Sequence, residues 1–121
     1  MVVTMTKIPC IVQRKTYEAA TSSKCPEFKH AACVFKGKRI FGIGRNVQYK
    51  THPSGSGPYC TMHAEVAAIT QAKNFFWPEK DLSGLSIFVM RVNKRGEIKF
   101  SKPCEDCMRL IRQYGLSPYW T

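Results

Sequence analysis

The chain has 121 residues, of which 44% are apolar, and this length and composition suit one domain with its own hydrophobic core. The sequence nowhere reaches the ~18–20 consecutive apolar residues of a membrane-spanning helix. Its first residues, MVVTMTKIPC, lack the cleavage site of a signal peptide. We therefore expect a single domain over residues 1–121, no membrane partner, and an intracellular, cytoplasmic protein.

The charge of the chain is strongly positive and unevenly distributed. The net charge is +11, and residues 1–50 alone hold ten Lys or Arg against two Asp or Glu. Residues 51–80 are neutral overall and residues 81–121 carry +3. Such an excess favours phosphorylated or polyanionic partners, although charge by itself leaves open a basic surface that binds no polyanion.

The first half of the chain predicts an irregular start followed by a β-hairpin. Residues 1–15 mix β-branched and basic residues, which predicts an edge strand or a loose arm, and a short helix is expected over 17–23. Two apolar runs at 30–35 and 39–44 are joined by a tight Lys-Gly-Lys turn, as in an antiparallel hairpin. The stretch THPSGSGPY at 51–59 has the composition of a loop.

A helix is expected to follow this loop. Thr61 is a suitable N-cap for an Ala-rich helix over residues 62–73, in which apolar residues recur at helical spacing. His63 and Glu65 then lie in the first turn, where the helix dipole favours negative charge.

The second half predicts a strand, a short arm, a helix and a final strand. The apolar run at 85–92 is typical of a central strand. The remaining elements follow in this order: a turn at 93–96, a short strand or extended arm at 97–100, Pro103 as the first helical position, an amphipathic helix at 104–114 ended by Gly115, and a last strand at 116–121. This alternation predicts an α/β fold in which helices pack on a sheet that contains parallel neighbours.

The pair Cys104 and Cys107 is the clearest chemical signal in the sequence. Two thiols three residues apart at a helix start lie on one face, about one turn apart. Alone, such a pair suits half of a structural four-cysteine zinc site, a thioredoxin-like redox pair, or a chance occurrence. The remaining cysteines form no second C-x-x-C. With His63 as a third ligand one coordination position stays open, which is typical of catalytic zinc, and Glu65 could then move protons beside it.

These residues together resemble a known family. The pattern His63-Ala64-Glu65 with Pro103-Cys104-x-x-Cys107 is similar to the zinc-dependent cytidine/deoxycytidylate deaminase superfamily, which also includes tRNA adenosine deaminases and polynucleotide cytidine deaminases. The likeness covers residues 28–121 and leaves 1–27 as a variable N-terminal segment. It implies a three-layer cytidine deaminase-like fold, with a mixed sheet flanked by helices.

The resemblance also assigns expected roles. It implies that His63, Cys104 and Cys107 bind Zn²⁺ and that Glu65 is the catalytic proton shuttle. Asn46, which ends the stretch Gly-Arg-Asn, and the backbone of Ala64 are expected to contact the substrate. The stretch MHAEVAAI is close to deoxycytidylate deaminases, and a histidine as first ligand points away from the free-cytidine deaminases.

Two departures from the family pattern stand out. The chain ends directly after the last expected strand, where many relatives continue with another helix and strand, so the fold is expected to be shortened at the C-terminus. An exposed strand edge is a liability, and a homo-oligomer could cover it. The stretch NKRGEIKF between the two motifs is an additional turn and arm.

The function expected from these features is zinc-dependent hydrolytic deamination of a cytosine base. The substrate is either a nucleotide such as dCMP or cytosine within a single-stranded nucleic acid. The alternatives are an adenosine deaminase acting on RNA and a non-catalytic, zinc-stabilised nucleic-acid-binding protein. Glu65 distinguishes enzyme from binding module, because a binding module has no use for a proton shuttle.

Overall fold

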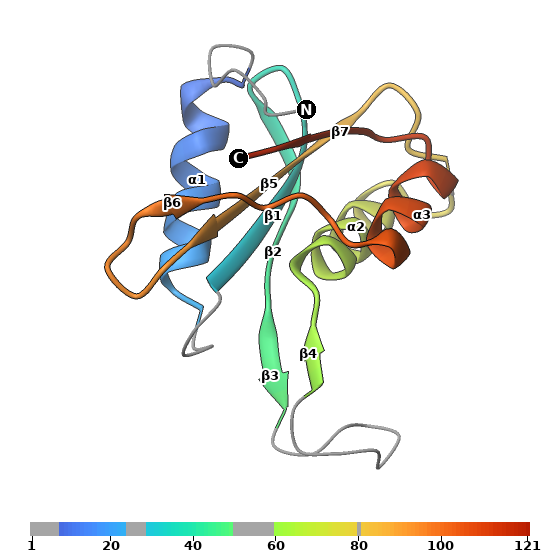
Figure 1. The fold of residues 1–121 in the computed structure, drawn as a ribbon. Coiled ribbons are helices and arrows are strands. Elements are labelled where there is room, and N and C mark those ends of the chain that lie inside the picture. Colours follow the sequence, from blue (N-terminus) through green and yellow to red (C-terminus); the bar gives the residue numbers. More distant parts are fainter. Residues whose placement is uncertain (1–7, 24–28, 50–59, 80) are drawn as a thin grey trace.

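The computed structural model describes residues 8–23, 29–49, 60–79 and 81–121, with the side chains of 47–49 and 60–62 left out. Its elements in chain order are α1 (Cys10–Thr21), β1 (Lys29–Lys36), β2 (Arg39–Arg45), β3 (Val47–Tyr49), β4 (Cys60–Met62), α2 (Ala64–Phe75), β5 (Ser86–Val92), β6 (Ile98–Lys99), α3 (Glu105–Gln113) and β7 (Ser117–Trp120) (Figure 1). Among these helices, none has the length and apolar character required to cross a membrane.

The main sheet is mixed and has β5 near its centre. Strand β1 pairs antiparallel with both β2 and β5. The other edge of β5 is shared by two strands. Strand β6 pairs antiparallel with the last residues of β5, and β7 pairs parallel with the first residues of β5. The expected hairpin of β1 and β2 and the expected parallel neighbour are therefore confirmed, although only the β5–β7 pair is parallel.

Helices cover both faces of this sheet, which gives three layers (Figure 1). Helix α1 packs on one face over an apolar cluster that includes Val12, Phe88 and Met90. Helices α2 and α3 pack on the other face over a second cluster that includes Ile69, Val89 and Ile111. Alternate residues of β1 and β5 belong to alternate clusters, as the two-residue period of a strand requires. The predicted three-layer α/β fold is confirmed.

Helix α2 lies directly against β2 because two glycines face it. A Cβ atom added to Gly42 or Gly44 would overlap backbone atoms of α2, including the carbonyl oxygens of Ala68 and Ala64. Buried alanines of α2 complete this contact between small residues. This close contact sets the distance between α2 and β2. It thereby also fixes the position of the first turn of α2 relative to the end of β2.

The prediction for residues 10–15 was wrong, because they belong to α1 and form neither an edge strand nor an arm. The helix begins after Pro9, whose φ of −55° suits a helix start. Val12, Thr16 and Ala20 are buried at a spacing of four residues, which is one helix face. The Thr16 hydroxyl donates a 2.6 Å bond to the carbonyl of Val12, so a polar residue is accommodated in the buried face.

Strands β3 and β4 form a separate two-stranded ladder that the sequence did not predict. Val47 pairs with Met62, and Tyr49 pairs with Cys60. The ladder extends away from the main sheet between β2 and α2 (Figure 1). The expected loop over 51–59 lies outside the described residues.

Candidate active site

The expected metal ligands come from the first turns of two neighbouring helices. His63 is the N-cap residue of α2 and Cys104 is the N-cap residue of α3, both with extended backbone. Cys107 lies three residues further along, one turn into α3. Two predictions were wrong here: Thr61 belongs to β4 and is not the N-cap of α2, and Pro103 precedes the N-cap of α3. In both helices the N-cap position is thus occupied by one of the expected metal-binding residues.

The geometry of these three side chains fits a zinc ion. Nδ1 of His63 lies 3.2 Å from Sγ of Cys107 and 3.7 Å from Sγ of Cys104. All three ligand atoms lie within 4.8 Å of one another. Tetrahedral zinc with Zn–N of about 2.0–2.1 Å and Zn–S of about 2.3 Å requires N···S separations of roughly 3.5 Å. The donor set and its spacing therefore fit zinc, with Nδ1 as the histidine ligand atom.

Glu65 is buried beside this site. It is the second residue of α2, and only 4% of its surface is exposed. Burial raises the pKa of the Cys107 thiol well above its usual range, and the Glu65 carboxylate beside it and Cys104 raise it further. A divalent cation between the ligands would oppose this shift, because positive charge favours thiolate. The first turn of α2 thus places a buried carboxylate beside Cys107.

Asn46 is brought to the site by the β3–β4 ladder. Asn46 precedes Val47 and His63 follows Met62, and Val47 pairs with Met62, so both residues directly adjoin the same end of the ladder. The Asn46 side-chain oxygen accepts bonds from the Ser23 hydroxyl, at 2.7 Å, and from the backbone N–H of His30, at 3.0 Å. Asn46 therefore also ties the segment after α1 to β1.

Ala64 is completely buried and its methyl group packs among the small residues between α2 and β2. Its side chain therefore has a packing role. Its backbone N–H is the first of α2, and the first N–H groups of a helix have no acceptor within the helix.

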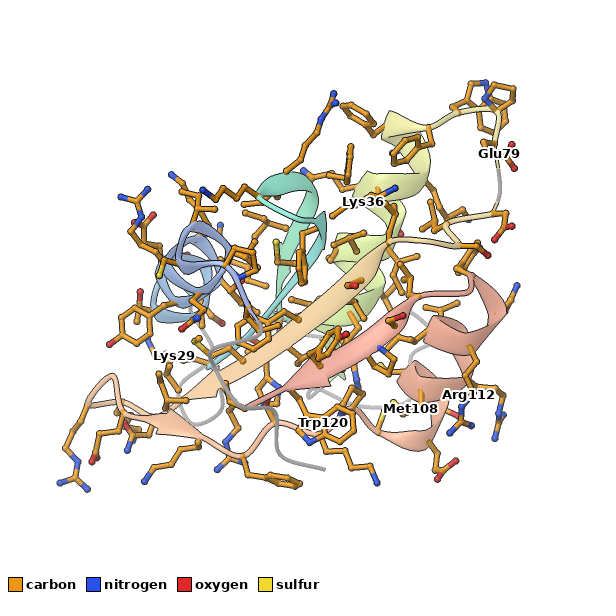
Figure 2. All side chains as sticks on the ribbon, turned by 90° about the horizontal axis from the view of Figure 1, so that it is seen from above. Lys29, Lys36, Glu79, Met108, Arg112 and Trp120 are labelled. Atoms are coloured by element: carbon orange, nitrogen blue, oxygen red, sulfur yellow. The ribbon has the colours of Figure 1, made fainter. Side chains whose placement is uncertain are left out.

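Further polar residues lie near this end of the sheet. His30 is half-buried, and burial, together with Arg91 and His63, lowers its pKa to about 4. Trp120 is 8% exposed, and its indole nitrogen has no hydrogen-bond partner among the described residues. It ends β7 beside the segment that leads into α3, where Lys102 Nζ lies 5.9 Å from its ring centre (Figure 2). An ionisable residue inside an apolar strand was the signal that could have identified His30 and Arg91.

Comparisons with known proteins agree with this geometry. The family described as the cytidine and deoxycytidylate deaminase zinc-binding region matches residues 5–119 of the chain. A search among curated proteins finds no match.

Solved structures of deaminases share the fold. An apo dCMP deaminase from the cyanophage S-TIM5 is 24% identical, with a TM-score of 0.64, over 93% of this chain and 82% of that one. The same enzyme in complex with dCMP and dUMP is 21% identical, with a TM-score of 0.62 over the same shares. A cytidine deaminase from Mycobacterium leprae is 21% identical, with a TM-score of 0.56, over 88% and 82%.

The family match spans nearly the whole chain, and it includes His63, Cys104 and Cys107, which the structure brings together. The chain belongs to the family of zinc-binding cytidine and deoxycytidylate deaminases, which are zinc-dependent hydrolases that act on cytosine-type substrates.

Proposed function

We propose that the chain deaminates the cytosine base of a nucleotide such as dCMP, using His63, Cys104 and Cys107 as zinc ligands and Glu65 as the proton shuttle. The observation that carries this proposal is the convergence of three ligand atoms within 4.8 Å beside a buried carboxylate. A purely structural zinc site has four protein ligands and no need of a neighbouring buried acid.

Zinc held by the three ligands supplies a Lewis acid that makes water nucleophilic near neutral pH. Glu65 accepts a proton from the attacking water and delivers it to the ring nitrogen, while the water oxygen forms a bond to C4. The same carboxyl then transfers the remaining water proton to the exocyclic amine, which leaves as ammonia while a C4 carbonyl forms. The burial of Glu65 supports this role, because it keeps bulk water from competing for the protons.

Two further residues are proposed to hold the substrate. The backbone N–H of Ala64 stands at the start of α2, next to His63, where it can donate to a polar group of the base. Asn46 directly precedes the ladder residue that pairs with Met62, the neighbour of His63, and two accepted hydrogen bonds fix the position of its side chain. We propose that it contacts the sugar or base.

A nucleotide is favoured over a nucleoside by two observations. The S-TIM5 relative has been solved in complex with dCMP and dUMP. The net charge of +11 also favours a phosphorylated substrate.

Cytosine within a single-stranded nucleic acid is the second candidate substrate. Phe100 is 60% exposed on the segment that leads to Cys104, and the exposed Lys99 and Lys102 flank it. Exposed aromatic rings among cations are typical of single-strand binding surfaces. Binding to oligonucleotides that weakens steeply with salt would favour this candidate.

The experiment is ammonia release from a panel of substrates by the zinc-loaded protein and by Glu65→Ala. The panel contains deoxycytidine, dCMP, a cytosine-containing oligonucleotide and the matching adenine compounds. We expect the wild type to release ammonia from dCMP and the variant to release none. Absence of activity from every compound would contradict deamination and favour a non-catalytic binding protein; activity on adenine alone would favour an adenosine deaminase.

Self-association is a separate prediction. Within the described residues, β7 pairs only with β5, so its other edge is available to a second copy of the chain. The molar mass measured in solution by light scattering tests it.

A further inference from the structure

A cluster of aromatic side chains lies at the C-terminal end of α2. Phe75 is the last residue of this helix, and Phe76 and Trp77 follow it directly. The ring centre of Phe41, from β2, lies 5.2 Å from that of Phe75 and 4.8 Å from that of Phe76. The ring centres of Phe75 and Phe76 lie 5.0 Å apart. We refer to Phe41, Phe75, Phe76 and Trp77 as the aromatic patch.

Two members of the aromatic patch are open to solvent and two anchor it. Trp77 is 75% exposed and Phe75 is 56% exposed, and Trp77 has the largest exposed fraction among the large apolar side chains that the structure describes. Phe41 and Phe76 are half-buried and pack against the core cluster beneath α2. Single exposed apolar side chains are normal, but contiguous exposed rings indicate a surface that binds a partner.

The backbone that carries Trp77 is held by hydrogen bonds. The N–H of Phe76 donates to the carbonyl of Ala72 at 3.2 Å, and the N–H of Trp77 donates to the carbonyl of Asn74 at 3.4 Å. The N–H of Glu79 then donates to the carbonyl of Phe76 at 2.8 Å. The end of the helix thus continues into a turn that supports the indole ring. Groups that are positioned before binding lose less conformational entropy when a partner binds.

Positive charges border the aromatic patch. The guanidinium carbon of Arg39, the first residue of β2, lies 5.3 Å from the ring centre of Phe41 and 5.9 Å from that of Phe75. Both distances suit a cation–π contact. Lys36 is directly opposite Arg39 in the ladder of β1 and β2, so the two side chains share a face. Lys38 lies in the turn between them, and all three cations are exposed.

Two acids follow the aromatic patch in the chain. The Glu79 carboxylate accepts a 3.2 Å bond from the N–H of Asp81. The Asp81 carboxylate accepts bonds from the N–H and the hydroxyl of Ser83, at 3.0 Å and 2.6 Å. Both carboxylates therefore bond to the loop that leads to β5, whereas the cation that contacts the rings, Arg39, comes from the hairpin of β1 and β2.

These features favour a partner that carries negative charge and flat apolar groups together. A second copy of the chain, docked symmetrically on the same surface, would bring the cations of the hairpin against one another, and like charges at an interface repel. Single-stranded nucleic acid has both features, because its bases stack on aromatic rings and its phosphates bind Arg and Lys. The net charge of +11 adds a general attraction for such a strand.

The aromatic patch lies away from the metal ligands. His63 is the N-cap of the 12-residue helix α2 and Phe75 is its last residue, so about 18 Å of helix separates them. In Figure 2, Lys36 and Glu79 lie in the upper part of the view, whereas Trp120, beside the segment that leads into α3, lies in the lower part. A ligand on the aromatic patch therefore leaves the metal site accessible.

We propose that the aromatic patch and the cations of the neighbouring hairpin bind single-stranded nucleic acid. Bases stack on Trp77 and Phe75, and Arg39 contacts a phosphate. Because every base has an aromatic face, this surface tolerates many sequences. The inference does not depend on the proposed deamination, because it uses none of the residues assigned to that reaction.

The test measures the affinity of the zinc-loaded protein for a fluorescently labelled oligothymidylate of about 15 nucleotides, a length within the usual range of single-strand sites. This probe contains no cytosine or adenine, so its binding is measured without deamination. The variants are Trp77→Ala, which removes the most exposed ring, and Arg39→Gln, which removes the cation that contacts the rings.

Two matched controls remove similar groups elsewhere. Phe100→Ala removes another exposed ring, which is 60% exposed and lies between β6 and α3. Lys94→Gln removes an exposed cation from the turn after the last residue of β5, whereas the loop that follows the aromatic patch leads to the first residue of β5. The length of this strand therefore separates Lys94 from the patch.

We expect Trp77→Ala to weaken binding by roughly 5–100-fold, as the loss of one stacked base does. Arg39→Gln should reduce the steepness of log Kd against log salt concentration by about 0.7, which corresponds to one phosphate contact on a single strand. Phe100→Ala and Lys94→Gln should keep the affinity within about twofold. Because the Trp77 side chain is mostly exposed, its removal leaves the fold intact.

The two tryptophans of the chain provide a direct readout of stacking. Trp120 is 8% exposed, so Trp120→Phe removes the buried indole and leaves the exposed Trp77 as the reporter. Oligothymidylate should quench the fluorescence of this variant over the concentrations at which it binds. An abasic strand of the same length, which carries phosphates without bases, should bind more weakly and should leave the fluorescence unchanged.

Several results would overturn the proposal. Failure of the wild type to bind oligothymidylate, or unchanged binding by Trp77→Ala, would refute it directly. A loss confined to Phe100→Ala would place the strand on the segment before α3 instead. Equal binding of polyglutamate, with the same dependence on Trp77, would assign an acidic protein partner. A molar mass in solution that Trp77→Ala lowers would show that the patch is buried between copies of the chain. Absence of deamination would contradict the proposed function alone, since binding of this probe requires no catalysis.

Discussion

At the scale of a single residue, the burial of the Glu65 carboxylate is the feature that suits proton transfer. Its carboxylate lies beside Cys107 at 4% exposure, although acidic side chains are rarely buried without a partner. We expect Glu65→Gln to lower kcat by about 10²–10⁴-fold, which is the usual contribution of general acid–base catalysis. Because Glu65 is not one of the three ligands, bound zinc should remain at one ion per chain when measured by mass spectrometry.

Glu105 offers a matched control for this prediction. It is also an acid in the first turn of a helix, directly after Cys104, but it is exposed. Glu105→Gln should leave kcat within about twofold, because an exposed charge contributes little. If both variants lost activity equally, the effect would belong to charge near the zinc and not to proton transfer by Glu65.

His30 predicts a pH dependence of stability. Its folded pKa of about 4 lies below the ordinary value of 6.5, so the unfolded chain binds the proton more readily. The stabilisation from a neutral His30 is present above pH 6.5 and is lost as the pH falls towards 4. We expect the free energy of unfolding of the metal-free wild type to fall between these values by about 1–3 kcal/mol more than that of His30→Gln.

Urea unfolding of both proteins at several pH values, in the presence of a chelator, measures this difference. The carboxylates titrate in the same range, but they contribute equally to both proteins, so the difference isolates the imidazole. Parallel curves for wild type and variant would mean that His30 is solvated at all pH values.

At the scale of elements, the contact between β2 and α2 controls where the first ligand stands. A methyl group at Gly44 would lie 2.7 Å from the Ala67 side chain and would overlap the backbone of α2. We expect Gly44→Ala to lower the free energy of unfolding by about 1–3 kcal/mol or more, as overpacking does. The variant should also bind zinc more weakly, because α2 carries His63.

Gly37 provides the control for this substitution. It lies in the turn between β1 and β2 at φ +56°, with no atom within 4 Å of an added Cβ. Asn tolerates this conformation, so Gly37→Asn should cost less than about 1 kcal/mol and should leave zinc affinity unchanged. A Gly44→Ala protein with wild-type stability and zinc affinity would show that α2 can shift without moving His63.

The helices and strands with a clear period of apolar residues were predictable from the sequence. Elements that depend on pairing with a distant segment were not. The strand at β5 and the amphipathic helix at α3 carry continuous or periodic apolar residues, and both were found. Helix α1 was predicted only in its last part, over 17–23, because its buried face contains Thr16 and Ala20, which give little apolar signal. The short β3–β4 ladder depends on pairing between distant residues, which local propensity does not encode.

The same distinction applies to the site. The cysteine spacing and the family motif together predicted that His63, Cys104 and Cys107 would meet, and their ligand atoms lie within 4.8 Å of one another. The sequence did not indicate that His30 lies opposite Arg91 and Arg91 opposite Lys99, because these residues meet only through the register of three strands. Charge counts indicated a phosphorylated partner without indicating where it would bind.

On the scale of the whole molecule, the ligands tie two helices of one layer together. His63 starts α2, both cysteines belong to the start of α3, and at the far end Lys73 of α2 lies 5.0 Å from the ring centre of Tyr114. Zinc that binds only the folded chain stabilises it by about 2.7 kcal/mol at 100 times its Kd. We therefore expect a chelator to lower the Tm by roughly 10 °C or more.

This stabilisation should also depend on pH in a defined direction. Burial and the Glu65 carboxylate raise the pKa of the Cys107 thiol in the metal-free protein, so zinc must displace that proton when it binds. The Tm difference between zinc-loaded and chelated protein should consequently shrink as the pH is lowered from about 8 to 6.

Cys107→Ser should have a low Tm that a chelator does not change. Cys10→Ser, at an exposed cysteine of α1, should respond to the chelator as the wild type does. A wild-type Tm that is indifferent to chelation would show that zinc is not part of the folded structure.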